Sequence, residues 1–270
     1  MRKKFCFGVL CTAFSAVSVF TLNLCSTPPV FSGEEVEAVA ETYLSEGDMR
    51  LFGGDMQEAR KMYEFVLKED PENYEALWRL TRFYISRGMA AEKTKDKIKE
   101  WQEARIYGER AVGLRPEGAE GHLYLAVSMG KLALFSPASE KVKFVRDIKE
   151  EAERAIELDP EEQKGYLALG AWHRNVATAS TLEKQLAKMF FGELPEGSLE
   201  ESLKLLEKSR ELGGADVRNF YELAMTYEAL GDYESAKTEF EKAVESRSVY
   251  PEDDELKERV RKELGRSRYN

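Results

Sequence analysis

Two histidines, His122 and His173, are the side chains in this sequence best suited to acid–base or metal chemistry near neutral pH. Neither has a second histidine four residues away, which is the spacing that zinc sites on one helix require. The three cysteines, Cys6, Cys11 and Cys25, all lie in an apolar N-terminal stretch. We therefore expect no metal site and no cofactor, and we interpret both histidines as packing residues of helices.

Other catalytic patterns are weak or missing in the sequence. It has no glycine-rich phosphate loop and no Gly-x-Ser-x-Gly elbow, and it has no strand pattern to carry either. Acidic pairs such as Glu200–Glu201 and Asp253–Asp254 are frequent, but such pairs usually lie on solvated helix faces in a chain with 50 acidic and 40 basic residues. We predict that the protein is not an enzyme. An enzymatic alternative would need a buried cluster of acids beside His122 or His173.

Helices of a repeat array are the elements that must position these side chains. In residues 217–250, apolar residues recur in two stripes at helical spacing, with a glycine between them, which predicts two helices joined by a tight turn. Small residues in both stripes let the two backbones approach closely. The spacing matches the 34-residue tetratricopeptide repeat at Phe220, Leu223, Ala224, Tyr227, Gly231, Ala236, Phe240 and Ala243.

The same pattern recurs along the rest of the chain. Residues 40–73 form a repeat of regular length, and two longer repeats with insertions follow. The fourth repeat opens near Tyr166, and its second helix, 199–212, is delayed by an irregular segment. Beyond Pro251, a charged helix has acids at its start and bases at its end, which suits the helix dipole. We predict an all-α tetratricopeptide-type superhelix of about five helix pairs with a C-terminal capping helix.

Three domains follow from this pattern: an N-terminal segment at 1–32, a repeat domain at 33–250 and the capping helix with a tail at 251–270. The first segment has three basic residues followed by an uncharged, largely apolar stretch, which is typical of a signal peptide or a membrane anchor. Cleavage, retention and lipidation at Cys25 stay open. This segment predicts an exported protein, periplasmic or membrane-anchored and facing outside the cytoplasm.

The fourth repeat and its irregular segment resemble the regulator of microtubule dynamics family. The resemblance is carried by Gly170, Trp172, Val176-Ala177, Leu182-Glu183-Lys184, Ala187, Phe190-Phe191-Gly192, Leu194-Pro195, Ser198 and Glu200-Glu201. In eukaryotes this family is linked to microtubules and to contacts between organelle membranes through an anchored helical repeat domain. The resemblance implies a helical adaptor and brings no catalytic residues.

The first helices of such arrays line a concave groove, and the residues at the inward positions predict a basic inner surface. An acidic peptide or the C-terminus of a polypeptide is the natural ligand, held by charge-assisted hydrogen bonds and aromatic anchors. The alternative is that these bases pair with Glu75, Glu120 and Glu228 and only solubilise the groove. Trp101 and Trp172 are interpreted as packing residues. The predicted groove residues are Trp78, Arg82, Lys131, Arg174, Asn175, Arg218 and Tyr221.

The sequence thus predicts an interaction scaffold that binds an extended or acidic peptide segment of a protein partner. The alternative is a membrane-contact or lipid-handling protein, which apolar groove positions at Leu123, Leu167 and Met225 allow. The formal net charge of −10, and a body that is more acidic still, argue against nucleic acid as the partner. The identity of the partner, the oligomeric state and the openness of the groove stay undetermined by the sequence.

Overall fold

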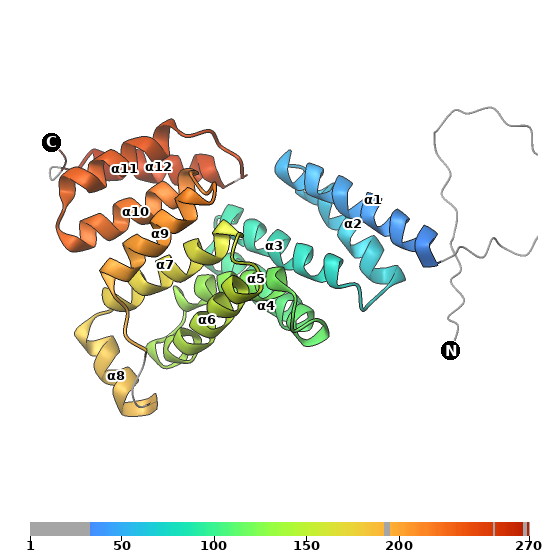
Figure 1. Ribbon diagram of the computed structural model, residues 1–270, viewed down its shortest axis with the longest axis horizontal. Coiled ribbons are helices and arrows are strands. Elements are labelled where there is room, and N and C mark those ends of the chain that lie inside the picture. Colours follow the sequence, from blue (N-terminus) through green and yellow to red (C-terminus); the bar gives the residue numbers. More distant parts are fainter. Residues whose placement is uncertain (1–32, 192–194, 251, 267–268, 270) are drawn as a thin grey trace, which may run out of the picture.

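A computed structural model describes residues 33–191, 195–250, 252–266 and 269 of the chain (Figure 1). Twelve α-helices and no strands make up this described part. The helices are α1 (Gly33–Phe52), α2 (Met56–Glu69), α3 (Tyr74–Ala90), α4 (Thr94–Leu114), α5 (Ala119–Ala133), α6 (Ala138–Leu158), α7 (Gln163–Ala177), α8 (Thr181–Phe191), α9 (Leu199–Glu211), α10 (Val217–Leu230), α11 (Tyr233–Glu245) and α12 (Asp253–Leu264).

The helices pack in pairs along the chain, which confirms the predicted all-α repeat architecture. The pairs are α1 with α2, α3 with α4, α5 with α6, α7 with α9, and α10 with α11. Helix α8 lies between the members of the fourth pair in sequence and packs against α6, so that it projects from the stack in Figure 1. The predicted delay of the second helix of this repeat is therefore produced by an extra helix.

Polar caps and one glycine define where the helices begin and end. Side chains at five helix starts accept a hydrogen bond from a backbone N–H three residues later, which satisfies a donor that would otherwise be unpaired. Gly231 ends α10 with a φ of 81°, the left-handed conformation that glycine adopts without strain, and this confirms the predicted tight turn. The five capping residues are Asp55, Asn73, Ser198, Asp216 and Asp232.

Two buried tryptophans join first and second helices through hydrogen bonds from their indole N–H groups to backbone carbonyls. Trp101 of α4 is 3% exposed and donates its indole N–H to the Ile85 carbonyl of α3 at 3.2 Å. Trp172 of α7 is 4% exposed and donates to the Val145 carbonyl of α6 at 2.7 Å. Buried indole groups need such partners, and both side chains have the packing role that the sequence predicts.

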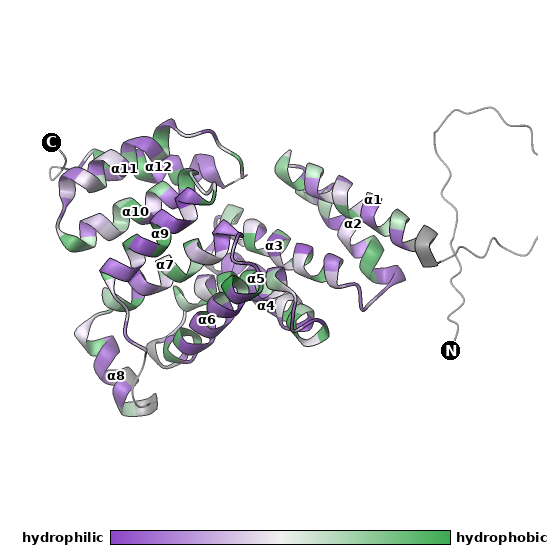
Figure 2. Cartoon of the chain, in the orientation of Figure 1, coloured by the Kyte–Doolittle hydropathy of each residue, from purple (hydrophilic) through white to green (hydrophobic). Residues whose placement is uncertain are grey.

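The C-terminal helix covers the end of the stack. Leu256 and Val260 of α12 are buried against Phe240 of α11 and Ala224 of α10. Hydrophilic residues cover much of the outer surface of α12 (Figure 2), as a helix that shields the last apolar face of a repeat array requires.

The predicted signal or anchor segment, including Cys25, lies outside the described residues. Within the described part of the chain, no helix has the length and apolar composition needed to cross a membrane.

Candidate ligand-binding groove

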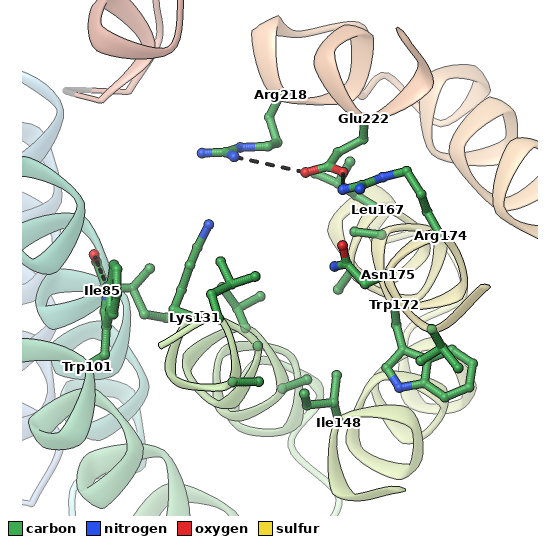
Figure 3. Close-up of a pocket in the computed structure, with 18 of the residues that line it drawn as sticks. Ile85, Trp101, Lys131, Ile148, Leu167, Trp172, Arg174, Asn175, Arg218 and Glu222 are labelled. Atoms are coloured by element: carbon green, nitrogen blue, oxygen red, sulfur yellow. Dashed lines mark hydrogen bonds and ion pairs between the residues drawn. The ribbon is translucent and has the colours of Figure 1, made fainter. Parts of the chain in front are cut away.

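The first helices of the middle and C-terminal repeats enclose a concave cavity of about 1280 Å³. Helices α3, α5, α7 and α10 form its walls (Figure 3), and Tyr250, Glu252 and residues of α12 up to Arg259 also line it. Its volume exceeds that of most small-molecule sites, so it has room for an extended ligand. Six of the seven predicted groove residues line it: Arg82, Lys131, Arg174, Asn175, Arg218 and Tyr221.

Trp78, the seventh predicted residue, does not belong to the cavity lining. Its ring is only 8% exposed and stacks on Tyr124 of α5, with ring centroids 5.6 Å apart. The Arg79 guanidinium covers the indole at 4.2 Å, and the indole N–H donates to Glu75 at 2.9 Å. Trp78 is therefore a packing residue between α3 and α5, because its repeat position is covered by the next first helix.

The charge of Arg82 is offset inside the protein. Its guanidinium pairs with Asp48 of α1 and donates to the Tyr63 hydroxyl at 3.3 Å, and its side chain is only 13% exposed. The same guanidinium lies 5.1 Å from the centre of the Phe52 ring. Arg82 thus joins the first two repeats at the edge of the cavity, and it offers little charge to a ligand.

A buried ion-pair cluster lies on the wall between α7 and α10. Glu222 is 7% exposed and accepts from Arg174 at 2.5 Å, while Arg218 lies 4.0 Å from the same carboxylate. Burial opposes ionisation of Glu222, but the two arginines hold its pKa below the usual value for a glutamate. Glu222 therefore stays charged and neutralises part of the predicted basic inner surface.

Lys131 differs from the other predicted groove cations because no acid pairs with it in the described part of the chain. It forms no ion pair or side-chain hydrogen bond with any residue in the described part of the chain. Its side chain extends from α5 into the open space toward Arg218 (Figure 3). Burial, together with the nearby cations Arg218 and Arg259, lowers the pKa of Lys131 to about 7. An anionic ligand group would relieve this repulsion, so Lys131 marks where such a group fits best.

Several charged residues of the cavity were not predicted from the sequence, among them two from the C-terminal segment. Arg259 of α12 lines the cavity with its guanidinium 5.9 Å from the Tyr221 ring, and Glu252 lies at the start of the same helix. Burial raises the pKa of Glu252. The sequence indicates only that α12 is a polar cap. The place of Arg259 at the groove follows from the packing of α12 on α10 and α11, which the repeat pattern does not describe.

The remaining cavity wall is largely apolar. Leu123 and Leu167 line it, as their inward repeat positions predict, and Val145, Ile148 and Leu134 extend the apolar surface. Met225, which was also predicted to face the groove, packs instead against the C-terminal hydrophobic cluster. The cavity therefore has a charged end near α10 and α12 and an apolar floor along α5 and α6.

The acids expected to neutralise the groove bases have other partners. Glu75 pairs with Arg79 at 2.7 Å and with Arg115 at 3.3 Å. Glu120 accepts from the Tyr74 hydroxyl at 3.3 Å, and Glu228 from the Tyr269 hydroxyl at 2.5 Å. The groove bases are partly neutralised, but by other acids: Asp48 pairs with Arg82, and Glu222 pairs with Arg174.

Both histidines have packing roles. His122 is 7% exposed, and its two ring nitrogens lie 2.5 Å from the Glu151 carboxylate and 2.8 Å from the Pro116 carbonyl. His173 accepts a hydrogen bond from the Ser198 backbone N–H at 3.3 Å, which ties α7 to the start of α9. Among the described residues, no three His, Cys, Asp or Glu side chains are grouped so that they could hold a metal ion.

Stacked helix pairs whose first helices line a concave face define a tetratricopeptide repeat protein. A thermophilic protein of this class from Thermus thermophilus has a TM-score of 0.59 at 19% identity, covering 83% of this chain and 98% of its own. The type IV pilus biogenesis factor PilW has a TM-score of 0.52 at 18% identity, covering 86% and 88%. At such identities these likenesses show the fold alone.

Within this class, the chain belongs to the regulator of microtubule dynamics family. The family model described as regulator of microtubule dynamics protein 1-3 matches residues 43–268, which confirms the resemblance seen in the sequence. Regulator of microtubule dynamics protein 2 of Rattus norvegicus is 31% identical over 216 residues, which cover 78% of this chain and 52% of that protein. Protein 1 of Mus musculus is 27% identical over 218 residues, covering 79% and 68%. The chain spans about half the length of the protein 2 relative.

The predicted location outside the cytoplasm is wrong. The relatives are mammalian proteins, whose cells have no periplasm, and their name connects them with microtubules, which are cytoplasmic polymers. Basic residues followed by an apolar stretch are common to export signals and membrane anchors. The pattern therefore does not distinguish export from anchoring in a membrane, and the prediction of export was not justified by it.

Proposed function

We propose that this chain is a non-enzymatic interaction scaffold that binds an extended segment of a partner protein in the concave cavity, with an acidic group of the segment at Lys131 and Arg218. The unpaired ammonium of Lys131 beside Arg218 is the observation that carries the proposal. Stacked helix pairs are a common platform for protein–protein contacts, and the fold supports this coarser role.

Charge and shape decide which kind of segment fits best. Because Asp48 and Glu222 offset Arg82 and Arg174, the groove favours one or two acidic groups rather than a long acidic run. The apolar floor next to Lys131 would hold neighbouring apolar side chains of the segment. The C-terminus of a polypeptide, or an acidic residue flanked by apolar residues, meets both requirements.

The test is a capture experiment from cell extract with the full chain and two matched variants. Lys131→Glu reverses the charge at the site, and because Lys131 has no ion pair among the described residues, no such contact is lost. Lys204→Glu makes the same charge change on the exposed side chain of α9, which is 76% accessible. We expect Lys131→Glu to reduce capture of the partner by about tenfold or more, and Lys204→Glu to leave it unchanged. Equal capture by all three proteins would refute the groove assignment.

A second candidate function, lipid handling at a membrane contact, is favoured by the apolar part of the cavity. Leu123, Leu134, Ile148 and Leu167 form a surface that could hold an acyl chain while its anionic head group meets Lys131. Extraction of the purified chain with organic solvent and mass spectrometry of the extract distinguishes this function. A bound lipid lost in Lys131→Glu would favour lipid handling over peptide binding. Membrane association through residues 1–32 stays a prediction, since those residues lie outside the described part of the chain.

A further inference from the structure

One edge of the stack gathers lysines in a protein that is acidic overall. The first helices α3, α5 and α7 all end at this edge, and α4, α6 and α8 begin there. The Lys141–Glu183 pair at 3.0 Å joins α6 to α8, and the Trp101 and Phe135 rings, 5.4 Å apart, join α4 to the α5–α6 turn. We call residues 91–99, 134–143 and 181–189 the lysine edge.

Most lysines of this edge have no acidic partner among the residues that the structure describes. The exposed side chains form no ion pair with any residue that the structure describes, in contrast to Lys141, which is paired with Glu183. Lys97, Lys184 and Lys188 also line the cavity, so one mouth of the cavity opens at this edge. The exposed lysines without an ion pair are Lys93, Lys95, Lys99, Lys143, Lys184 and Lys188.

Large apolar side chains are exposed between these lysines. Leu134 and Phe135 in the α5–α6 turn are 57% and 42% exposed, and Leu182 and Met189 on α8 are 64% and 73% exposed. Helix α8 projects from the stack beside the start of α6 (Figure 1). Apolar side chains flanked by lysines are typical of surfaces that lie at the boundary between head groups and acyl chains.

The opposite edge, where the second helices end, has the opposite charge. Exposed acids occur in or next to the turns from α2 to α3, from α4 to α5 and from α6 to α7, at Glu72, Glu117, Glu120, Glu157 and Glu161. The lysine edge also has the exposed acids Glu92, Asp96 and Glu140, but its eight lysines outnumber its four acids, so the stack has a positive and a negative edge. Near a negatively charged surface, such a charge distribution orients the molecule with the lysine edge toward the surface.

We propose that the lysine edge docks on an anionic lipid bilayer, with its lysines at the head groups and Leu134, Phe135, Leu182 and Met189 in the outer part of the acyl region. A bilayer fits better than an acidic protein because the lysines are spread along a projecting edge with protruding apolar side chains between them. The proposal depends on the charge distribution of the described residues, and Leu134, Phe135 and Lys188 of this surface also line the cavity. It places one mouth of the cavity against the membrane.

The first test is flotation of the full chain with vesicles of phosphatidylcholine, with and without phosphatidylserine. Any contribution of residues 1–32 is the same in every variant, so the quantity compared is the increase that phosphatidylserine produces. Each lysine near an anionic surface contributes about fivefold in affinity. We expect Lys93→Glu/Lys143→Glu/Lys188→Glu to reduce this increase by at least about tenfold, whereas the matched control Lys68→Glu/Lys204→Glu/Lys262→Glu keeps it.

The second test reports orientation. With Cys6, Cys11 and Cys25 replaced by serine, a polarity-sensitive dye is attached to Met189→Cys on the lysine edge or to Leu114→Cys, which is 41% exposed at the other end of α4. We expect a blue shift on phosphatidylserine vesicles for the dye at position 189 alone. A shift at position 114 but not at 189, no increase with phosphatidylserine, or full retention of that increase in the lysine-edge variant would each overturn the proposal.

Discussion

Replacing Glu222 by glutamine should loosen the contact between the fourth and fifth repeats. The side chains of Glu222 and Arg174 are only 9% and 12% exposed, and they hold α10 against α7 at 2.5 Å. Removal of one partner from a buried ion pair destabilises by about 3–5 kcal/mol, because the other charge is left without compensation. Glutamine keeps one hydrogen-bond acceptor and the groove admits water, so we expect Glu222→Gln to lower the free energy of unfolding by about 2–3 kcal/mol.

Thermal unfolding followed by circular dichroism at neutral pH measures this effect. For a domain of this size, about 2–4 °C per kcal/mol gives a decrease in Tm of roughly 4–12 °C. Glu201→Gln is the matched control, since its pair with Lys204 is exposed at 40% and 76% and should contribute less than about 1 kcal/mol. Nearly equal Tm values for the two variants would refute a stabilising role of the buried cluster.

The stabilising effect of Glu222 should also depend on pH, which can be measured by comparing the unmodified protein with Glu222→Gln. The pKa of Glu222 is lower in the folded protein than in the unfolded chain, so its ionised form stabilises the fold above the ordinary carboxyl pKa. This contribution is lost as the pH falls through the folded-state pKa. The difference in Tm between the unmodified protein and Glu222→Gln should therefore narrow in acid. A Tm difference that stays constant as the pH falls below the ordinary carboxyl pKa would contradict the ionised state assigned to Glu222.

Two further predictions concern the groove and the core. Because the pKa of Lys131 is about 7, its charged fraction falls as the pH rises, so affinity for an acidic peptide should decrease by up to about tenfold between about pH 6 and about pH 8. Titration calorimetry should show a much weaker pH dependence for Lys131→Arg, and an equal dependence in both proteins would assign it to another group. A Cβ added at Gly88 would lie 2.4 Å from the Trp101 indole nitrogen, so Gly88→Ala should destabilise the fold by about 1–3 kcal/mol in denaturant unfolding. Gly130→Ala, where nothing lies within 4 Å, should be neutral or stabilising, and similar losses for both would contradict this packing.

The repeat pattern predicts the fold well because packing between neighbouring helices is local in sequence. Alanine, glycine and aromatic positions such as Ala236 and Phe240 recur at fixed spacing, and each contacts residues from the same or the adjacent repeat. Turns and caps such as Gly231 and Asp232 depend on neighbouring residues alone. The helix pairs and the second helix of the fourth repeat are therefore readable from the sequence.

The charge state of the groove could not be predicted in the same way. Asp48 and Arg82 are separated by 34 residues and Arg174 and Glu222 by 48, and each pair joins the first helices of two adjacent repeats. Trp78 has an inward repeat position, yet Tyr124 of the next first helix covers it. Arg259 enters the cavity from the capping helix, which the repeat frame does not place. The repeat pattern predicts which apolar residues pack together, but it does not predict which polar side chains of neighbouring repeats meet.

The most direct test of the proposed scaffold role is site-specific photo-crosslinking in living cells. A photoreactive amino acid at Asn175, an exposed residue of the cavity wall, is compared with the same group at Ile106, which is 50% exposed on α4 and does not line the cavity. The proposal predicts a covalent adduct with a polypeptide from position 175 that is absent from position 106 and is lost in Lys131→Glu. A lipid-sized adduct, equal adducts from both positions, or none from position 175 would contradict peptide binding in the groove.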